Sequence, residues 1–174
     1  MDLPNRKHPR LKSYDYSLPG YYYVTIHAEK GAPSLSAIWQ DVIIAREGQR
    51  MPGRPRIILT ESGEIARQQL VALEKRFPMV SIDKYVIMPN HIHVILRILE
   101  LSAGASPRPT LMDMIGTYKS LTTREINRRA GFSGRKVFQS SFYETVLRNE
   151  KAYQTCWTYI DENPDKWLLN PEDI

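Results

Sequence analysis

The feature that most constrains the fold is the run of residues 88–97, in which two histidines alternate with apolar residues. In an extended strand, successive side chains point to opposite faces of the sheet. His91 and His93 therefore share one face, and the residues between and after them, beginning with Ile92 and Val94, occupy the other. The pattern predicts a strand that has an apolar core on one side and two imidazoles on the other.

The two imidazoles are close enough to bind one ion. Residues two apart on a strand have Cα atoms roughly 7 Å from each other, so both rings can reach one ion if another part of the chain supplies a third ligand. Pro89 and Asn90 predict a tight turn into the strand. We interpret His91 and His93 as half of a metal site; the alternative is two half-buried polar residues at the start of a strand.

The length of 174 residues fits one domain, which we expect to span residues 1–174, with a basic arm over residues 1–19. No apolar run approaches the roughly 20 residues that cross a bilayer, so no membrane association is expected. The start of the chain lacks an apolar signal-peptide core, and Cys156 is the only cysteine. These features predict a cytoplasmic location.

Lysine and arginine number 24 against 19 aspartates and glutamates, which gives a net charge of +5. The basic residues concentrate in residues 119–136, where Glu125 is the only acidic residue, whereas the chain after Ile160 is mostly acidic. A basic cluster favours an acidic partner such as nucleic acid. A solvated helix face is the alternative interpretation.

The remaining pattern predicts an α+β fold. We expect strands at 21–27, within 37–46, at 56–59 after a turn at 52–55, at 80–88 in a hairpin with the histidine strand, and at 142–147. We expect helices from Thr60 to Phe77, from 111 to 129, and from 150 to 163, where Pro164 ends the last one. This order suits an antiparallel sheet with helices packed on one face.

A metal beside a basic helix is typical of phosphoryl chemistry, in which a tyrosine can attack phosphorus. Tyr118 lies in the apolar stripe of its helix, where a core role is the better interpretation. On the last helix, Tyr159 and Asn163 flank the predicted packing stripe and are four residues apart, so they are neighbours on the helix surface. Tyr159 is therefore the preferred nucleophile. His27, at the end of the first strand, is interpreted as a surface residue, and a neighbour of the histidine site is the alternative.

Several segments together resemble the REP-associated tyrosine transposases, which belong to the single-tyrosine transposases with a His-hydrophobic-His motif. The similarity covers nearly the whole chain after about Arg10, and the combination of the Pro-Asn-His-x-His strand with the Tyr-Ile-x-x-Asn-Pro helix is specific. The segments that carry it are residues 22–26, 86–94, 118–120, 124–127, 142–144, 147–150 and 159–164.

The resemblance implies a ferredoxin-like α+β core with the histidine pair on a central strand. It implies that His91 and His93 bind a divalent Mg or Mn ion, that Tyr159 is the nucleophile, and that Asn163 is a further ligand where related transposases have a longer glutamine. The implied function is that of a nucleoid-associated endonuclease and strand transferase, acting through a 5'-phosphotyrosine on single-stranded DNA with palindromic hairpins. The chain would work as a monomer or homodimer. Expected DNA contacts are Arg6, Lys7, Arg10, Lys119, Arg124, Arg128 and Arg129.

Two rival functions remain. A catalytically idle module could bind hairpin nucleic acid with the same sheet and basic helix. A related relaxase or replication initiator is the other rival, although such proteins are typically larger.

Overall fold

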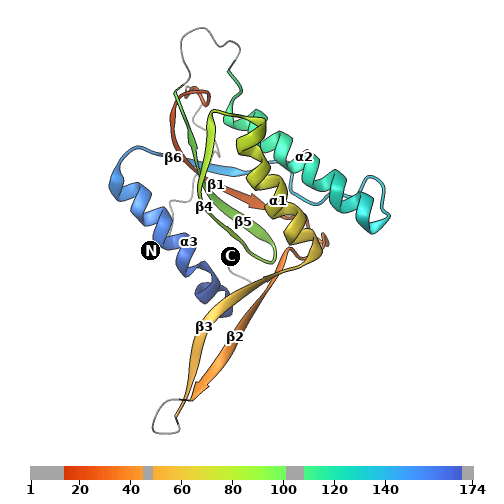
Figure 1. Cartoon of the computed structure of the whole chain (residues 1–174), viewed down its shortest axis with the longest axis vertical. Helices are drawn as coiled ribbons and strands as arrows, with labels where there is room; N and C mark the ends of the chain where they lie inside the picture. Colours follow the sequence, from red (N-terminus) through yellow and green to blue (C-terminus); the bar gives the residue numbers. More distant parts are fainter. Residues whose placement is uncertain (1–13, 45–48, 101–107, 170–174) are drawn as a thin grey trace.

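The computed structural model describes residues 14–44, 49–100 and 108–169. The elements in order are β1 (Gly20–His27), β2 (Ser36–Ile44), β3 (Arg50–Leu59), α1 (Glu61–Arg76), β4 (Val80–Ile87), β5 (His91–Ile98), α2 (Leu111–Ala130), β6 (Tyr143–Leu147) and α3 (Glu150–Leu169). Strands β4, β5, β1 and β6 form an antiparallel sheet in that order, and β2 pairs with β3 in a separate ribbon (Figure 1). The α+β fold is confirmed, with the histidines on the central strand β5.

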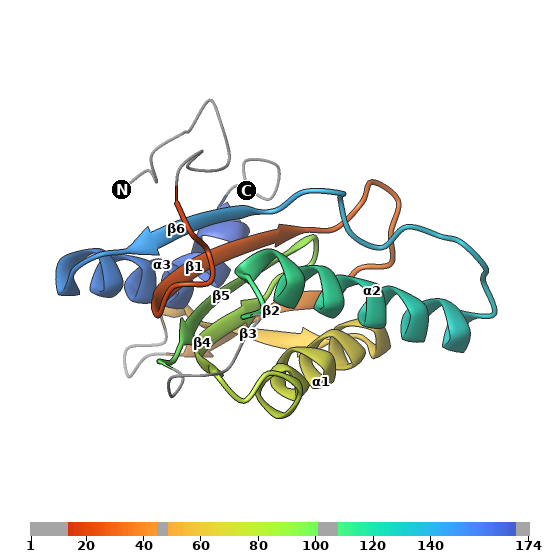
Figure 2. The same ribbon diagram turned by 90° about the horizontal axis from the view of Figure 1, so that it is seen from above.

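Helices cover both faces of the four-stranded sheet, so the expectation that they pack on one face is wrong. Helices α1 and α2 lie side by side and share a core with Val24, Ile92 and the residues that alternate with them (Figure 2). Helix α3 packs on the opposite face, where Tyr23 and Ile95 form a second core. The histidine face also carries apolar side chains, and burying them requires a helix on that side as well.

Strand β3 runs through the segment where a turn was expected. Residues 52–55 lie inside β3, with Pro55 opposite Gln40 and Pro52 opposite Val42, and the register shifts between these pairs. Proline cannot donate to a strand ladder, but it is tolerated at the edge of a sheet and at bulges. A two-stranded ribbon has only edge strands, so both prolines fit.

Helix α3 continues to Leu169, and the prediction that Pro164 ends it is wrong. Proline removes one helical hydrogen bond and usually disfavours the residue before it in a helix. Here Asn163 and Pro164 are both buried against the sheet, and Trp167, beyond them, packs near His91. Tertiary packing of the last turn offsets the local cost of the proline.

The first turn of α1 is fixed by a cap and by a close backbone approach. Thr60 accepts a hydrogen bond from the backbone N–H of Gly63, as the predicted helix start requires. Gly63 is buried, and a Cβ atom there would lie 1.7 Å from the carbonyl oxygen of Leu35. Only glycine allows the chain before β2 to pass this close to the helix.

Candidate active site

His91 and His93 lie on the face of β5 that α3 covers. Both are buried, and their ring centroids are 4.5 Å apart. Antiparallel pairing with β1 places Thr25 opposite His93 and His27 opposite His91. The alternation of residues in the strand therefore brings both imidazoles into one enclosed region between the sheet and α3.

Each nitrogen of His91 faces an amide oxygen. Nδ1 lies 2.6 Å from Oδ1 of Asn90, and Nε2 lies 3.1 Å from Oδ1 of Asn163 on α3. With Nδ1–H donating to Asn90, Nε2 presents a lone pair to the Asn163 oxygen. Two acceptors in this arrangement can bind one cation together. Asn163 was expected to flank the buried face of its helix, but it is fully buried.

His93 has one nitrogen held by hydroxyl groups and one without a partner. Nδ1 lies 2.7 Å from the hydroxyl oxygen of Tyr23 and 2.9 Å from that of Thr25. Nε2 is buried and has no hydrogen-bond partner among the described residues, and the same is true of Nδ2 of Asn163. A buried ring nitrogen of this kind costs free energy unless an ion or a ligand satisfies it.

The imidazoles are held in the neutral form that binds metals. Burial, reinforced by the nearby His27, lowers the pKa of His91 to about 4, and burial lowers the pKa of His93 well below its usual value. His27 was interpreted as a surface residue; instead it is half-buried, with its ring 5.8 Å from that of His91. Within the described ranges, no group of three or more His, Cys, Asp or Glu side chains is arranged to hold a metal.

Tyr159 lies beside this pair of histidines. Its half-buried ring is 5.3 Å from the ring of His93 and 6.4 Å from that of Tyr23, and Nζ of Lys166 lies 4.4 Å from its centroid. Tyr118, in contrast, is fully buried in the core on the other face of the sheet, as its position in the helical stripe predicted.

Sequence reasoning missed four residues around the site: Tyr23, Thr25, Lys166 and Trp167. Tyr23 and Thr25 share one face of β1, and their alternation was a visible signal, but the register that brings them to His93 was not. The ring of Trp167 lies 6.1 Å from that of His91, on a helical turn that was not expected to exist.

The predicted DNA-binding residues of α2 lie away from the histidines, on the helix that covers the opposite face of the sheet. Lys119 donates to the backbone oxygen of Ser140 at 2.8 Å and lines an open groove of about 460 Å³ with Arg124 and Lys136. The predicted contacts Arg6, Lys7 and Arg10 lie outside the described residues.

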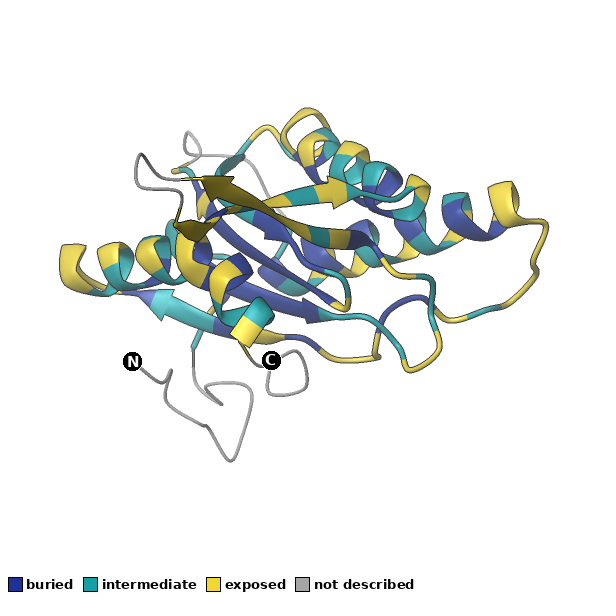
Figure 3. Ribbon diagram, turned by 90° about the horizontal axis from the view of Figure 1, so that it is seen from below, coloured by how far each residue is buried: buried dark blue, intermediate teal, exposed yellow. Residues whose placement is uncertain are grey.

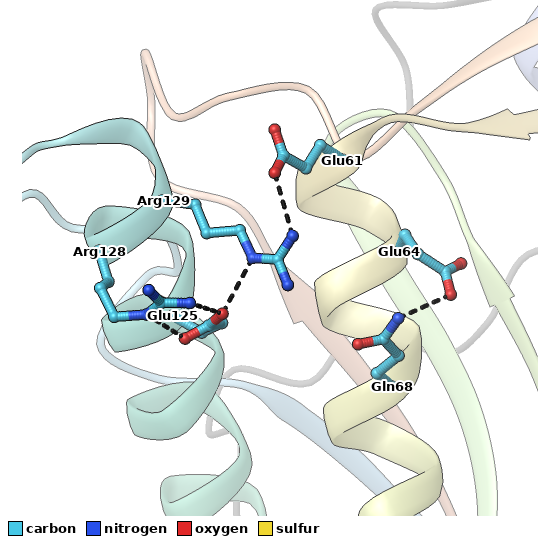
Figure 4. Close-up of polar contacts among 6 residues, drawn as sticks. All are labelled: Glu61, Glu64, Gln68, Glu125, Arg128 and Arg129. Atoms are coloured by element: carbon cyan, nitrogen blue, oxygen red, sulfur yellow. Dashed lines mark hydrogen bonds and ion pairs between the residues drawn. The ribbon is translucent and has the colours of Figure 1, made fainter.

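The arginines of the last turn of α2 are already engaged by carboxylates. Arg128 and Arg129 both donate to Glu125, and Arg129 also reaches Glu61 on α1 at 3.3 Å (Figure 4). Their guanidinium groups are therefore partly neutralised within the protein, whereas Arg124, which is exposed as they are, forms no ion pair among the described residues.

No protein-family model matches the chain. An uncharacterized protein of Haemophilus influenzae is 30% identical over an alignment of 178 positions, which covers 95% of this chain and 91% of that protein. A solved REP-associated tyrosine transposase bound to a REP hairpin superimposes with a TM-score of 0.58 at 18% identity, over 95% of this chain and 74% of that one. A solved protein from Deinococcus radiodurans R1 is less similar: it gives a TM-score of 0.48 at 14% identity over 89% of this chain and 96% of that one. No helix in the described part of the chain is long and apolar enough to cross a membrane.

Proposed function

We propose that this chain, which belongs to one family with the Haemophilus influenzae protein and has the fold of the REP-associated tyrosine transposase, nicks and joins single-stranded DNA at hairpin sites. The shared fold supports a transposase-like, nucleic-acid-processing function. One arrangement carries the finer proposal: Nε2 of His91 lies 3.1 Å from Oδ1 of Asn163, and the ring of His93, whose buried Nε2 has no partner among the described residues, lies 4.5 Å from the ring of His91 and 5.3 Å from that of Tyr159.

The donor set fits a divalent ion, which His91, His93 and Asn163 would hold. Two imidazole nitrogens and one amide oxygen suit an ion that accepts both donor types, so Mn fits better than Mg, which prefers oxygen ligands. When bound, such an ion polarises a phosphate oxygen. Nδ1 of His91 and Nδ1 of His93 are held by neighbouring side chains, which fixes the orientation of each ring.

Tyr159 is the proposed nucleophile. Its phenolic oxygen attacks the phosphorus of a backbone phosphate, the bond from phosphorus to the 3' oxygen breaks, and the released 3'-hydroxyl takes up the proton that the phenol gives up. The product is a 5'-phosphotyrosine ester. Attack on that ester by a 3'-hydroxyl restores a phosphodiester and frees Tyr159, so no nucleotide cofactor is required.

The substrate is proposed to be single-stranded DNA that folds into a hairpin. The solved transposase with the same fold is bound to a REP hairpin, and the net charge of +5 favours a polyanion. Lys119, Arg124, Arg128 and Arg129 on α2, with Arg6, Lys7 and Arg10 before the first strand, are the proposed phosphate contacts.

Trapping the covalent intermediate tests the proposal. Labelled hairpin DNA and Mn are incubated with the wild-type protein and with the Tyr159→Phe and Tyr118→Phe variants, and adducts are separated on a denaturing gel. We expect adducts from wild type and Tyr118→Phe and none from Tyr159→Phe, which keeps its ring contacts and still binds hairpin DNA.

Peptide mapping of the adduct supplies the decisive comparison. DNA attached to any tyrosine other than Tyr159 would overturn the assignment. Hairpin binding without an adduct from the wild-type protein would favour the catalytically idle binding module.

A further inference from the structure

The β2–β3 ribbon extends beyond the rest of the molecule as an arm (Figure 1). At its base, Ile38 pairs with Ile57, and both pack against the core beneath α3. Past this pair most residues of both strands are exposed (Figure 3). Each strand has nine or ten residues, which corresponds to a length of roughly 30 Å.

The arm combines exposed apolar side chains with arginines. Trp39, Val42, Ile43, Ile44, Met51 and Ile58 are each more than half exposed. Arg50, Arg54 and Arg56 follow one another along β3, and Asp41 is the single carboxylate of the described part of the ribbon. Asp41 accepts a hydrogen bond from Nε1 of Trp39 at 2.9 Å and is paired with Arg56.

The arginines of the arm that are not paired with Asp41 favour an anionic partner. Among the described residues, neither Arg50 nor Arg54 forms an ion pair, so the described part of the arm presents two unpaired positive charges beside its apolar side chains. An exposed apolar surface of this kind marks an interaction site. A protein partner would have to be acidic as well as apolar, whereas a nucleic-acid duplex offers phosphates along the outside of its grooves and thymine methyl groups, which apolar side chains can contact, within the major groove.

The shape of the arm also fits a duplex. A two-stranded β-ribbon can enter the major groove, and in proteins that bend DNA apolar side chains and proline insert between base steps. Pro52 and Pro55 cannot donate to a further strand, and the irregular register beside them disfavours pairing of β3 with a second copy of the chain. These features disfavour the addition of a further strand to the ribbon, but they do not prevent the ribbon from entering a DNA groove.

We infer that the β2–β3 ribbon is a DNA-binding arm that enters the groove of the duplex stem of the hairpin. This inference rests on the proposed function for its substrate. Arg50 and Arg54 contact phosphates of the stem, and Ile43 and Met51, which lie opposite each other on one face of the ribbon, contact the bases. The arm holds the stem outside the histidine site, so it contributes to binding and not to the chemical step.

Salt-dependent binding tests the arm. Fluorescence anisotropy measures the affinity for hairpin DNA in EDTA over a series of salt concentrations, with Tyr159→Phe in every protein so that no cleavage occurs. Because each duplex phosphate contact contributes about 0.9 to the slope of log K against log salt, Arg50→Gln/Arg54→Gln should reduce the slope by about 1.8. The matched control, Lys75→Gln/Arg76→Gln, removes the same charge from exposed positions in the last turn of α1 and should leave the slope unchanged.

Equal slopes for the arm variant and the parent protein would overturn the inference, as would equal reductions in the arm variant and its control. A dimer that becomes monomeric on Ile43→Ser, with unchanged affinity for the hairpin, would show instead that the ribbon binds a second copy. If the wild-type protein forms no covalent adduct, the proposed cleavage is refuted. If the arm variant nevertheless binds the hairpin more weakly than its parent, the inference about the arm still holds.

Discussion

At the scale of single residues, Thr25 shows how a hydroxyl on a neighbouring strand can prepare an imidazole for metal binding. Its hydroxyl oxygen lies 2.9 Å from Nδ1 of His93, in a place where both residues are buried. A partner at Nδ1 fixes the ring orientation, and when Nδ1–H donates to the hydroxyl, Nε2 keeps its lone pair. The hydroxyl oxygen of Tyr23 lies 2.7 Å from the same nitrogen.

We predict that Thr25→Val weakens Mn binding by about tenfold to a hundredfold, the usual cost of losing a residue that orients a metal ligand. Valine keeps the shape of threonine and its preference for strands, so the fold should persist. Calorimetric titration with Mn measures the affinity. Thr122→Val, a similarly buried change on α2, is the control and should bind Mn as the wild type does. If Thr25→Val also binds Mn with wild-type affinity, Thr25 does not orient His93.

Local patterns explain which site residues could be predicted. The histidine pair follows from strand alternation, and the proximity of Tyr159 to Asn163 follows from helical spacing. Tyr23 and Thr25 could not be found in this way, because strand β1 meets β5 across more than sixty residues of sequence, and no local pattern fixes such a register. The burial of Asn163 likewise depends on the packing of α3 against the sheet.

At the scale of elements, two helical glycines have opposite roles. A Cβ at Gly63 would collide with the backbone carbonyl of Leu35, whereas nothing lies within 4 Å of a Cβ at Gly116 in α2. Alanine is favoured over glycine inside a helix by about 1 kcal/mol. Of the two positions, only Gly116 can gain this stability on replacement by alanine, because alanine at Gly63 would force either the helix or the chain before β2 to move.

We predict that Gly116→Ala raises the free energy of unfolding by up to about 1 kcal/mol, and that Gly63→Ala lowers it despite the better helix propensity. Urea unfolding followed by circular dichroism measures both, and each variant serves as the control for the other. Equal stabilisation by the two substitutions would mean that α1 does not pack against the carbonyl of Leu35.

The helices and strands also show where local rules fail. The start of α1 and the capping box of α2, formed by Thr110 and Asp113, agree with the local sequence. Prolines led to two wrong predictions: the residues expected to form a turn at 52–55 are part of strand β3, and helix α3 continues past Pro164. In the first case a ribbon edge needs no donor, and in the second the burial of Asn163 and Pro164 outweighs a lost hydrogen bond. Both outcomes depend on tertiary contacts that the local pattern does not contain.

At the scale of the whole molecule, the sheet separates two kinds of surface. Helix α3 and the histidines occupy one face, and α2, which carries the exposed Arg124, Arg128 and Arg129, covers the other. DNA that contacts both must pass around an edge of the sheet. The cations of α2 are not equally free to bind phosphate, because Glu125 holds two of them.

The last prediction concerns this internal neutralisation. Hydrogen bonds from Arg128 and Arg129 lower the pKa of Glu125 to about 2, which shows that both arginines stabilise its carboxylate, and this carboxylate competes with phosphate for both guanidinium groups. Glu125→Gln should therefore increase the affinity for hairpin DNA and steepen its salt dependence, as measured by fluorescence anisotropy. Glu64→Gln is the matched control, since Glu64 holds Arg67 on α1 in the same way. An equal gain in both variants would show only the effect of net charge, and no gain in Glu125→Gln would mean that the last turn of α2 is a solvated face that does not contact DNA.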